Sequence, residues 1–552
     1  MKGISDEDYE HAQKVWNAIG GVALGNYHDV YLNTDVLLLP DVFETFRHTC
    51  QEHYGIDLPH FYTTPGLAWR AALKETKVAL ELLTDINMLL MFEKGLRGGI
   101  IQAVKRYAKA NNSYMPDYKP DEASTFIQYL DANNFYGWAM VQKLPTNGFR
   151  WIKDPEKFTP EFIEKLVEKD NKGYILEVDV EYPQTLHKTH NDLPFLPETM
   201  TIGKVRKLVP NLYNKQRYVM HIRTWNQALK HGLVLTKVHR AIKFEQEAWL
   251  KPYIDKNTQL RTKAKIKSEQ DFFKLMNNSV FCKTMENLRN HRDIKLITDE
   301  QQYKKYVQKL NFKDSVRFSE NLIGVEIGKL KITMNKPVYL GQAIIDMSKL
   351  DIAGDVEARF DTSGYSKDDN RPLPLCKNKK VICLMKDELS GKIMTEFVAL
   401  RAKMYAYRIL DESEGKRCKG IKSFEDYKEC LFGGKTMYRE QVLFEHKKHE
   451  IYTVNKSKIA LNRDDDKRII AEDGIKTQFQ IDKNGQLTKW CIKCLDGQKA
   501  TQETRLRDAL NYDTEGARER RIPQRRIATR EAPLQKHTAD VDRRQPKEGQ
   551  SI

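Results

Sequence analysis

The sequence predicts a multidomain protein of the α+β class. A chain of 552 residues, 40% of them hydrophobic, is too long for one core and has enough apolar side chains for several. Residues 126–130 form a short apolar run that ends in a polar turn, and residues 268–287 carry apolar side chains at helical spacing. Residues 150–250 mix strand-like and helix-like patterns. This mixture of short strands and amphipathic helices indicates the class.

The chain is strongly basic, with a formal net charge of +16. Such an excess favours polyanionic partners, because each phosphate contact releases a counterion. A merely basic soluble protein is the plainer alternative. The most apolar stretch, residues 78–92, is interrupted by Glu81, Asp85 and Asn87. We therefore expect no membrane span, no signal peptide and no membrane partner.

The first informative segment is residues 128–140. Asp131 follows the apolar run, Asn133 and Asn134 form a turn, and Phe135 and Tyr136 open a helix. This order predicts a carboxylate at the rim of a buried strand with a flat ring close by, as a site for a divalent metal and a nucleoside triphosphate requires. In the alternative interpretation, the Asp and Asn side chains only cap the helix.

The second segment is residues 268–287, where Ser268 followed by Asp271 is typical of a helix N-terminus. The side chains predicted to face a core are Phe272, Phe273, Met276 and Val280. A different face lines up one cation, one amide and one ring: Lys274, Asn278 and Phe281. Such a helix can hold a triphosphate by its lysine and stack a base on its ring, and Arg261 adds positive charge on the approach. The alternative is an amphipathic helix with a solvated polar face.

Both segments together, in this order, resemble the family B DNA polymerases. The similarity is closest to the protein-primed branch carried by large self-synthesising DNA transposons, the Polinton or Maverick elements. The family motif D-x-x-S/N-L-Y is similar to residues 131–136, and K-x-x-x-N-S-x-Y/F-G is similar to residues 274–282, with Cys282 in place of glycine. The resemblance extends over about residues 1–475 and implies a right-hand polymerase with palm, fingers and thumb.

The resemblance also implies roles for individual residues. Asp131 would bind Mg²⁺ and act in catalysis, and Lys274 would neutralise the triphosphate and protonate the leaving pyrophosphate. Tyr136 would lie under the sugar and exclude a 2′-hydroxyl. Arg261, Asn278 and Phe281 would complete the nucleotide site. The implied partners are primer–template DNA, dNTPs and a priming terminal protein.

Two further places match DNA-binding motifs of the family. Paired Gly98 and Gly99 let a backbone approach a phosphate closely, and Arg97 can contact one, although the tyrosine of the family's Y-x-G-G motif is missing. A plain loop is the alternative. Lys403 and Tyr405 match a K-x-Y motif that holds the primer terminus. In an extended strand, their side chains would face the same side.

The N-terminal part resembles the end of an RNase H-like 3′–5′ exonuclease domain. Tyr31 and Asp35 form a Y-x-x-x-D pattern that places a phenol and a carboxylate one helical turn apart. The partner carboxylates are not found upstream, and one carboxylate cannot hold two metals. We infer that the chain begins inside the exonuclease domain and that proofreading is absent. A nuclease is a weaker alternative function.

The resemblance predicts six regions. They are residues 1–90, an exonuclease remnant and linker; 91–250, palm with the first motif and a terminal-protein-type insertion; 251–330, fingers with the second motif; 331–410, palm; 411–484, a thumb-like segment; and 485–552, a disordered basic tail.

The second catalytic aspartate of the family is missing from its expected place. It belongs to a D-T-D-S hairpin that should lie between Lys349 and Phe360, where only ten residues stand. Asp361-Thr362-Ser363 resembles a segment that normally follows this hairpin, and Asp351 and Asp355 are weak substitutes. We therefore predict weak or absent DNA synthesis with DNA binding retained. The alternative is a non-catalytic DNA-binding relic of a transposon polymerase. The sequence does not give the compartment; a eukaryotic transposon product would act in the nucleus.

Overall fold

The computed structural model divides the chain into two compact units. The described residues are 6–169, 172–202, 205–350, 359–363, 378, 381–410, 414–416, 423–447, 450–465, 468–471 and 473–478. The first unit comprises Met1–Gly99, Gln128–Glu181 and Asn214–Gly391, and the second comprises Ile100–Ile127, Tyr182–Tyr213 and Lys392–Ile552. Both units combine helices with sheets, which confirms the α+β class. The predicted tail, residues 485–552, lies outside the described residues.

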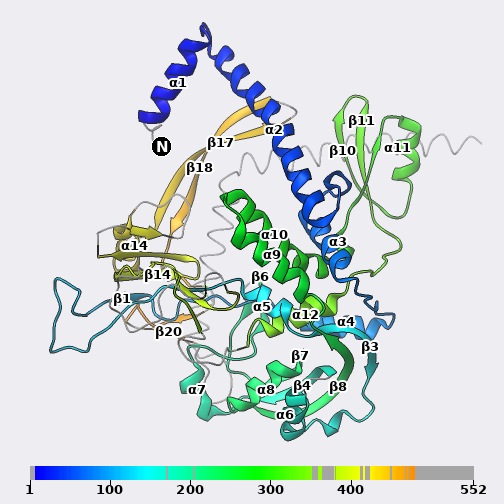
Figure 1. Cartoon of the computed structure of the whole chain (residues 1–552), viewed down its shortest axis with the longest axis vertical. Helices are drawn as coiled ribbons and strands as arrows, with labels where there is room; N and C mark the ends of the chain where they lie inside the picture. Colours follow the sequence, from blue (N-terminus) through cyan, green and yellow to red (C-terminus); the bar gives the residue numbers. More distant parts are fainter. Residues whose placement is uncertain are drawn as a thin grey trace, which may run out of the picture. The chain divides into compact units, whose positions relative to one another are not determined.

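The first unit is built on a four-stranded antiparallel sheet (Figure 1). Its strands, in spatial order, are β3 (Leu144–Trp151), β8 (Val234–Glu247), β4 (Lys172–Glu181) and β7 (Lys215–His221). Helices α4 (Ile86–Gly95) and α12 (Val338–Met347) pack on β7, and α12 also packs on β3. Helix α8 (Ile222–Lys230) contacts β4, β7 and helix α6 (Pro160–Lys169).

One hydrophobic core joins this sheet to the helices of the first unit. Every residue of α12 is buried, so this helix lies at the centre of the core. The surrounding helices are α3 (Thr64–Thr76), α5 (Phe135–Val141), α9 (Lys251–Lys263) and α10 (Lys267–Thr284). The hydroxyl of Tyr339 donates to the carbonyl oxygen of Glu81 at 2.7 Å, so the buried phenol is satisfied.

The N-terminal helices extend away from this core. Helix α1 (Asp6–Ala18) has no buried residue, and α2 (Leu24–Tyr54) buries only Cys50 and Tyr54, at its end. Tyr31 and Asp35 lie on α2 one turn apart, as predicted, and both are exposed. Their assignment to an exonuclease remnant stays a prediction.

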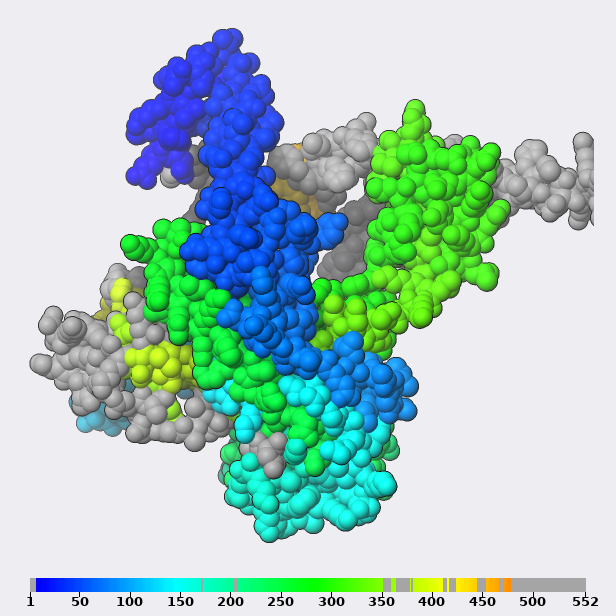
Figure 2. Space-filling model, turned by 45° about the vertical axis from the view of Figure 1, so that its right-hand side comes forward, coloured from blue at the N-terminus to red at the C-terminus, as the bar shows by residue number. Residues whose placement is uncertain are grey.

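A small insertion in the first unit has its own core. It consists of β9 (Asp293–Ile297), α11 (Glu300–Val307), β10 (Phe312–Ser319) and β11 (Leu322–Ile327), with β11 between the other two strands. Ile297, Val325 and Ile327 form its buried centre. Figure 2 shows these residues as a separate green lobe.

The second unit contains another four-stranded sheet. The strands, in order, are β1 (Tyr107–Lys109), β14 (Met394–Arg401), β15 (Met404–Ile409) and β16 (Glu414–Lys416). Helix α14 (Phe424–Phe432) packs on β14 and β15 and buries Phe424 and Tyr427. The other elements are α7 (Gln184–His190) and the pairs β5 (Glu198–Ile202) with β6 (Val205–Val209), β17 (Met437–Lys447) with β18 (Glu450–Leu461), and β19 (Ile469–Ile470) with β20 (Thr477–Gln478).

Within the described residues, no helix is long and apolar enough to cross a bilayer.

Candidate functional site

Asp131 lies in a strand of a small sheet in the first unit. Strand β2 (Leu130–Ala132) pairs with β13 (Met385–Asp387), and β13 pairs with β12 (Phe360–Asp361). The predicted strand, turn and helix are confirmed, because α5 begins at Phe135 directly after the turn. The prediction of a buried strand is wrong: Asp131 is exposed and Leu130 is 37% exposed. The cause is that β2 is an edge strand, with a single neighbouring strand among the described residues.

Asn134, and not Asp131, caps the following helix. Asn134 takes the left-handed conformation, with φ of 46°, and its side-chain oxygen accepts a hydrogen bond from the Gly137 nitrogen at 3.3 Å. A side chain at position 137 would collide with that amide, which explains the glycine. The capping interpretation therefore applies to Asn134 alone.

The two motif segments meet through an aromatic stack. The rings of Tyr136 on α5 and Phe281 on α10 lie 4.8 Å apart between centroids, with their planes at 28°. Tyr136 is 38% exposed, so one side of the stack faces solvent. Residues far apart in the sequence therefore form one aromatic surface beside the turn that follows Asp131.

Helix α10 presents the two faces that its spacing predicts. Phe273, Met276 and Val280 are buried, whereas Lys274 is exposed and Asn278 is half-buried. Phe281 is also half-buried, but it packs against the same core as Phe272. The predicted N-terminus is slightly wrong. The helix begins at Lys267, and its N-cap is Ile266, which makes no side-chain cap.

A buried hydrogen-bond network fixes the rotation of α10 about its own axis. The sequence analysis did not predict this network. Asn257 on α9 donates to Asn277 at 2.8 Å and accepts from the Tyr54 hydroxyl at 2.7 Å. Asn277 is 2% exposed and precedes Asn278 directly, so this contact determines which way Lys274 and Asn278 point. The sequence signal that could have revealed this network is the pair of adjacent asparagines in an otherwise amphipathic helix. On the last turn of α9, the buried Nε of Arg261 makes no hydrogen bond among the described residues.

Asp131 has a lysine as its neighbour on the adjacent strand of the small sheet. Its register partner on β13 is Lys386, whose own partner on β12 is Asp361. Paired residues point to the same face of a sheet, so the Lys386 side chain projects on the same face as both carboxylates, and its ammonium lies 3.3 Å from the Glu388 carboxylate. Asp361 is 3% exposed and accepts from the Asn133 side chain at 2.7 Å and from the Ser363 nitrogen at 3.0 Å. Asp351 and Asp355 lie outside the described residues.

Comparison with protein families decides the assignment. The sequence profile of DNA polymerase type B, organellar and viral, matches residues 28–336, which is more than half of the chain. The chain belongs to the family B DNA polymerases. At the level of the family, this confirms the predicted DNA-directed DNA polymerase and the right-hand polymerase fold class.

Solved structures of Phi29 DNA polymerase are also similar to the chain. The ternary complex with primer-template DNA and incoming nucleotides is 12% identical, with a TM-score of 0.45 over 83% of this chain and 73% of that one. An orthorhombic crystal form is 13% identical with a TM-score of 0.45, and a complex with single-stranded DNA is 14% identical with a TM-score of 0.44, both over the same shares. No curated protein matches this sequence.

Family B polymerases depend on divalent metal ions, and the described residues fit a two-ion site poorly. Two carboxylates must bridge ions about 3.5–4 Å apart. Asp361 lies two strands from Asp131, which separates their backbones by roughly 10 Å, and Lys386 stands between them. No group of three or more His, Cys, Asp or Glu side chains suited to a metal occurs in the described part of this polymerase.

The predicted DNA-binding glycines lie in a loop after α4. Gly98 and Gly99 are exposed, and a Cβ at either would meet nothing within 4 Å. Arg97 is used inside the first unit: it donates to the Val219 carbonyl oxygen at 2.9 Å, and its guanidinium lies 3.8 Å from the centre of the Tyr218 ring. The loop is therefore open to a ligand, although Arg97 is held against the protein.

In the second unit, the expected geometry of Lys403 and Tyr405 is wrong. Lys403 does not belong to a strand; it lies in the turn between β14 and β15 with φ of 61°. Tyr405 lies in β15, 5.7 Å from the Phe397 ring. The alternation of an extended strand therefore does not place the two side chains on one side. Their binding of primer stays a prediction.

Proposed function

We propose that this polymerase is of the protein-primed type and derives from a Polinton-like transposon. In the form described here, it binds primer–template DNA and dNTPs but extends primers weakly or not at all. The observation that carries the proposal is the stack of Tyr136 on Phe281, because it joins the two motif segments at one solvent-facing surface.

The nucleotide is proposed to bind along the polar face of α10. Exposed Lys274 would neutralise the triphosphate, and Asn278 and Phe281 would contact the base pair. Tyr136 would exclude a 2′-hydroxyl from its position against Phe281. Arg261 would add a second cation, which its unpartnered Nε supports.

Weak synthesis is proposed because only one suitable carboxylate is present in the described residues. Mg²⁺ would be the metal, held by Asp131 and by an aspartate that the missing hairpin would supply. Without the second carboxylate, much of a rate enhancement that spans many orders of magnitude is lost. The register partner of Asp131 on β13 is Lys386, so this neighbour does not supply the second carboxylate either.

DNA binding is proposed to rest on the basic charge of the chain and on three local candidates. These are the open loop with Gly98 and Gly99, Lys403 in its turn, and Tyr405. A terminal protein is the proposed primer, by resemblance to the protein-primed branch.

Primer extension tests this proposal. We expect salt-sensitive binding of a primer–template duplex with little or no extension when Mg²⁺ and all four dNTPs are supplied. Robust incorporation by this chain would contradict weak synthesis. Failure to bind the duplex at low salt would contradict the polymerase assignment of the site.

The second candidate function is a DNA-binding relic without catalysis. The register of the small sheet favours this function. The neighbour of Asp131 on β13 is Lys386, and the next carboxylate in register, Asp361 on β12, is buried and does not face solvent. A relic would bind DNA with the same affinity in the presence and absence of dNTPs. An intact nucleotide site would bind the duplex more tightly when the next complementary dNTP is present.

A further inference from the structure

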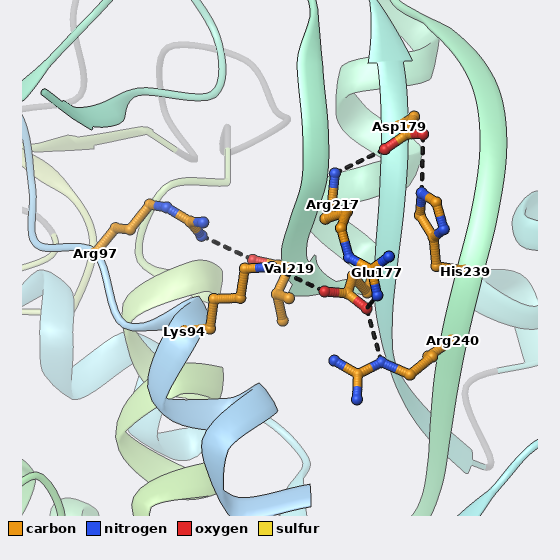
Figure 3. Close-up of polar contacts among 8 residues, drawn as sticks. All are labelled: Lys94, Arg97, Glu177, Asp179, Arg217, Val219, His239 and Arg240. Carbon is orange, nitrogen blue, oxygen red and sulfur yellow. Dashed lines mark hydrogen bonds and ion pairs between the residues drawn. The ribbon is translucent and has the colours of Figure 1, made fainter. Parts of the chain in front are cut away.

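A carboxylate on β4 holds three cations from three other elements. Glu177, with a side chain 1% exposed, contacts Lys94 of α4 at 2.8 Å, Arg240 of β8 at 2.7 Å and Arg217 of β7 at 3.3 Å (Figure 3). We call Lys94, Arg217 and Arg240 the cation cluster. All of its members belong to the first unit.

The backbone is strained where it places one of these cations. Arg217 has φ of 48°, a conformation that costs a non-glycine residue about 1–3 kcal/mol. Its backbone nitrogen donates to Asp179 at 2.7 Å, and Asp179 also lies 2.8 Å from Nε2 of His239. Surrounding contacts thus stabilise an unfavourable backbone, and the side chain of Arg217 remains against Glu177, as Figure 3 shows.

The cluster carries more positive charge than its anchor neutralises. Burial alone would raise the pKa of Glu177, but hydrogen bonds from Arg240 and Lys94 outweigh it and lower the pKa to about 2. The carboxylate is therefore ionised at neutral pH, and the three cations exceed the charge of the two carboxylates in this group, Glu177 and Asp179. A purely structural ion pair needs one cation, so the excess points to an external anion.

The cations, and not the carboxylate, face solvent. The side chains of Lys94, Arg217 and Arg240 are 44%, 54% and 37% exposed. Arg240 contacts Glu177 through Nε, and its two terminal nitrogens point away from the carboxylate in Figure 3. These donors suit bidentate binding of an oxyanion, and their fixed position lowers the entropy cost of binding.

The surroundings favour a nucleic acid over a protein. Of the elements that carry the cluster, β7 exposes no large hydrophobic side chain among its described residues, β8 exposes Val234, and α4 exposes Ile86 and Leu90, whereas the centre of a protein interface is predominantly apolar. Lys94 lies at the end of α4, directly before the open loop with Gly98 and Gly99. A sugar–phosphate backbone can pass over such a loop without meeting side chains.

We propose that the cation cluster binds phosphates of single-stranded DNA, at a place separate from the Tyr136–Phe281 surface. The inference rests on the proposed function, because it assumes that the chain handles DNA. It names Lys94, Arg217 and Arg240 as backbone contacts that carry no sequence preference.

The test compares two double variants that lose the same charge. Lys94→Gln with Arg217→Gln removes two members of the cluster and leaves Arg240 on Glu177. The control, Lys230→Gln with Lys304→Gln, removes two exposed lysines that each pair with one glutamate, at 3.1 and 3.2 Å. Thermal unfolding of both variants checks that the fold is retained.

Binding of a fluorescent single-stranded oligonucleotide is measured over a range of salt concentrations. The cluster variant should lose about tenfold in affinity at low salt, and the slope of log K against log salt should fall by about 1.4, for two lost phosphate contacts. The control variant should keep the parental slope. Equal slopes for both variants would overturn the inference.

Two further binding measurements show which kind of molecule supplies the anion. Binding of a free dNTP should be unchanged in the cluster variant; if it is lost, the cluster is a triphosphate site and not a DNA site. A poly-glutamate peptide should bind both variants equally. If only the cluster variant loses that peptide and DNA binding is unchanged, the partner is an acidic protein segment and the inference is wrong.

These outcomes are distinct from failure of the proposed function. A parental chain that binds no DNA would contradict both proposals. A parental chain that binds DNA with a slope insensitive to the cluster substitutions would contradict only the inference about the cluster.

Discussion

Asp131 and Glu177 lie on strands of two different sheets in the same unit, and their surroundings differ completely. Glu177 is buried under three cations, whereas Asp131 is exposed on an edge strand with one lysine opposite. A carboxylate whose lone pairs are occupied inside the protein stabilises the fold. A carboxylate exposed to solvent remains available to bind an ion. We therefore expect Glu177 to matter for stability and Asp131 for chemistry.

The largest expected effect concerns Asp131 in a version of the chain that carries a D-T-D-S hairpin between Lys349 and Phe360. We call this the hairpin version. In it, Asp131→Asn should reduce primer extension by roughly three orders of magnitude or more, because one of two metal-bridging carboxylates is removed. The free energy of unfolding should change by no more than about 0.5 kcal/mol, since the side chain is exposed. A large loss of stability would contradict the contrast with Glu177.

A third carboxylate, Asp346, extends the comparison to a buried carboxylate that is paired with a partly exposed lysine. It accepts from the His221 nitrogen and the Gln342 side chain, both at 2.9 Å, and lies 3.4 Å from Lys349. Burial raises the pKa of Asp346 and lowers that of Lys349. Asp346→Ala should lower the free energy of unfolding by about 3 kcal/mol, because these donors lose their acceptor.

Urea unfolding measures the effect of Asp346→Ala. The control is Asp314→Ala, at an exposed position of β10 in the same unit. Equal stability of the two variants would show that the buried carboxylate contributes little.

Glu177→Gln should lower the free energy of unfolding by about 2 kcal/mol, because the half-exposed cations can regain water in part. The matched control is Glu164→Gln on α6, which removes a carboxylate from one exposed lysine pair. The control should change stability by less than about 0.5 kcal/mol. If both substitutions cost the same, the contrast between buried and exposed carboxylates does not hold.

The difference in unfolding free energy between the parent chain and Glu177→Gln should depend on pH. The pKa of Glu177 is about 2, below its ordinary value of 4.5, so its stabilising contribution is complete above about pH 4.5 and is lost as the pH falls towards 2. Glutamine does not titrate. The gap in unfolding free energy between parent and Glu177→Gln should therefore narrow over this range. A gap that stays constant down to pH 2.5 would contradict the assigned cause.

The smallest expected effect concerns the aromatic stack beside Asp131. Phe281→Leu keeps most of the volume and loses the ring interaction with Tyr136, which should cost about 0.5–1.5 kcal/mol. The matched control is Phe318→Leu, at a half-exposed ring outside the site. Thermal unfolding measures both. An equal shift for the two variants would mean that the stack adds nothing beyond buried area.

Local patterns predicted much of the site. The polar turn before Phe135 and the spacing of Phe273, Met276 and Val280 depend on neighbouring residues, and the structure confirms both elements. Exposure of Asp131 was not predictable in the same way, because it depends on how many strands flank β2. The position of Lys403 was not predictable for a similar reason. The chain turns between two strands at this residue, so the alternation of side chains along a strand does not apply to it.

The cation cluster illustrates why long-range contacts were missed. Lys94, Glu177, Arg217 and Arg240 are scattered over the sequence, and each looks like an ordinary surface charge. Only the antiparallel order of β8, β4 and β7 brings them to one carboxylate. The buried contact between Asn257 and Asn277 depends in the same way on the packing of α9 against α10.

We propose that Asp131 lacks only a second acidic partner, and that the polymerase fold around it is intact. The most direct test runs primer extension with Mg²⁺ on this chain and on the hairpin version side by side. We expect that only the hairpin version elongates the primer, while both bind the duplex equally well. Comparable elongation by the two proteins would contradict it.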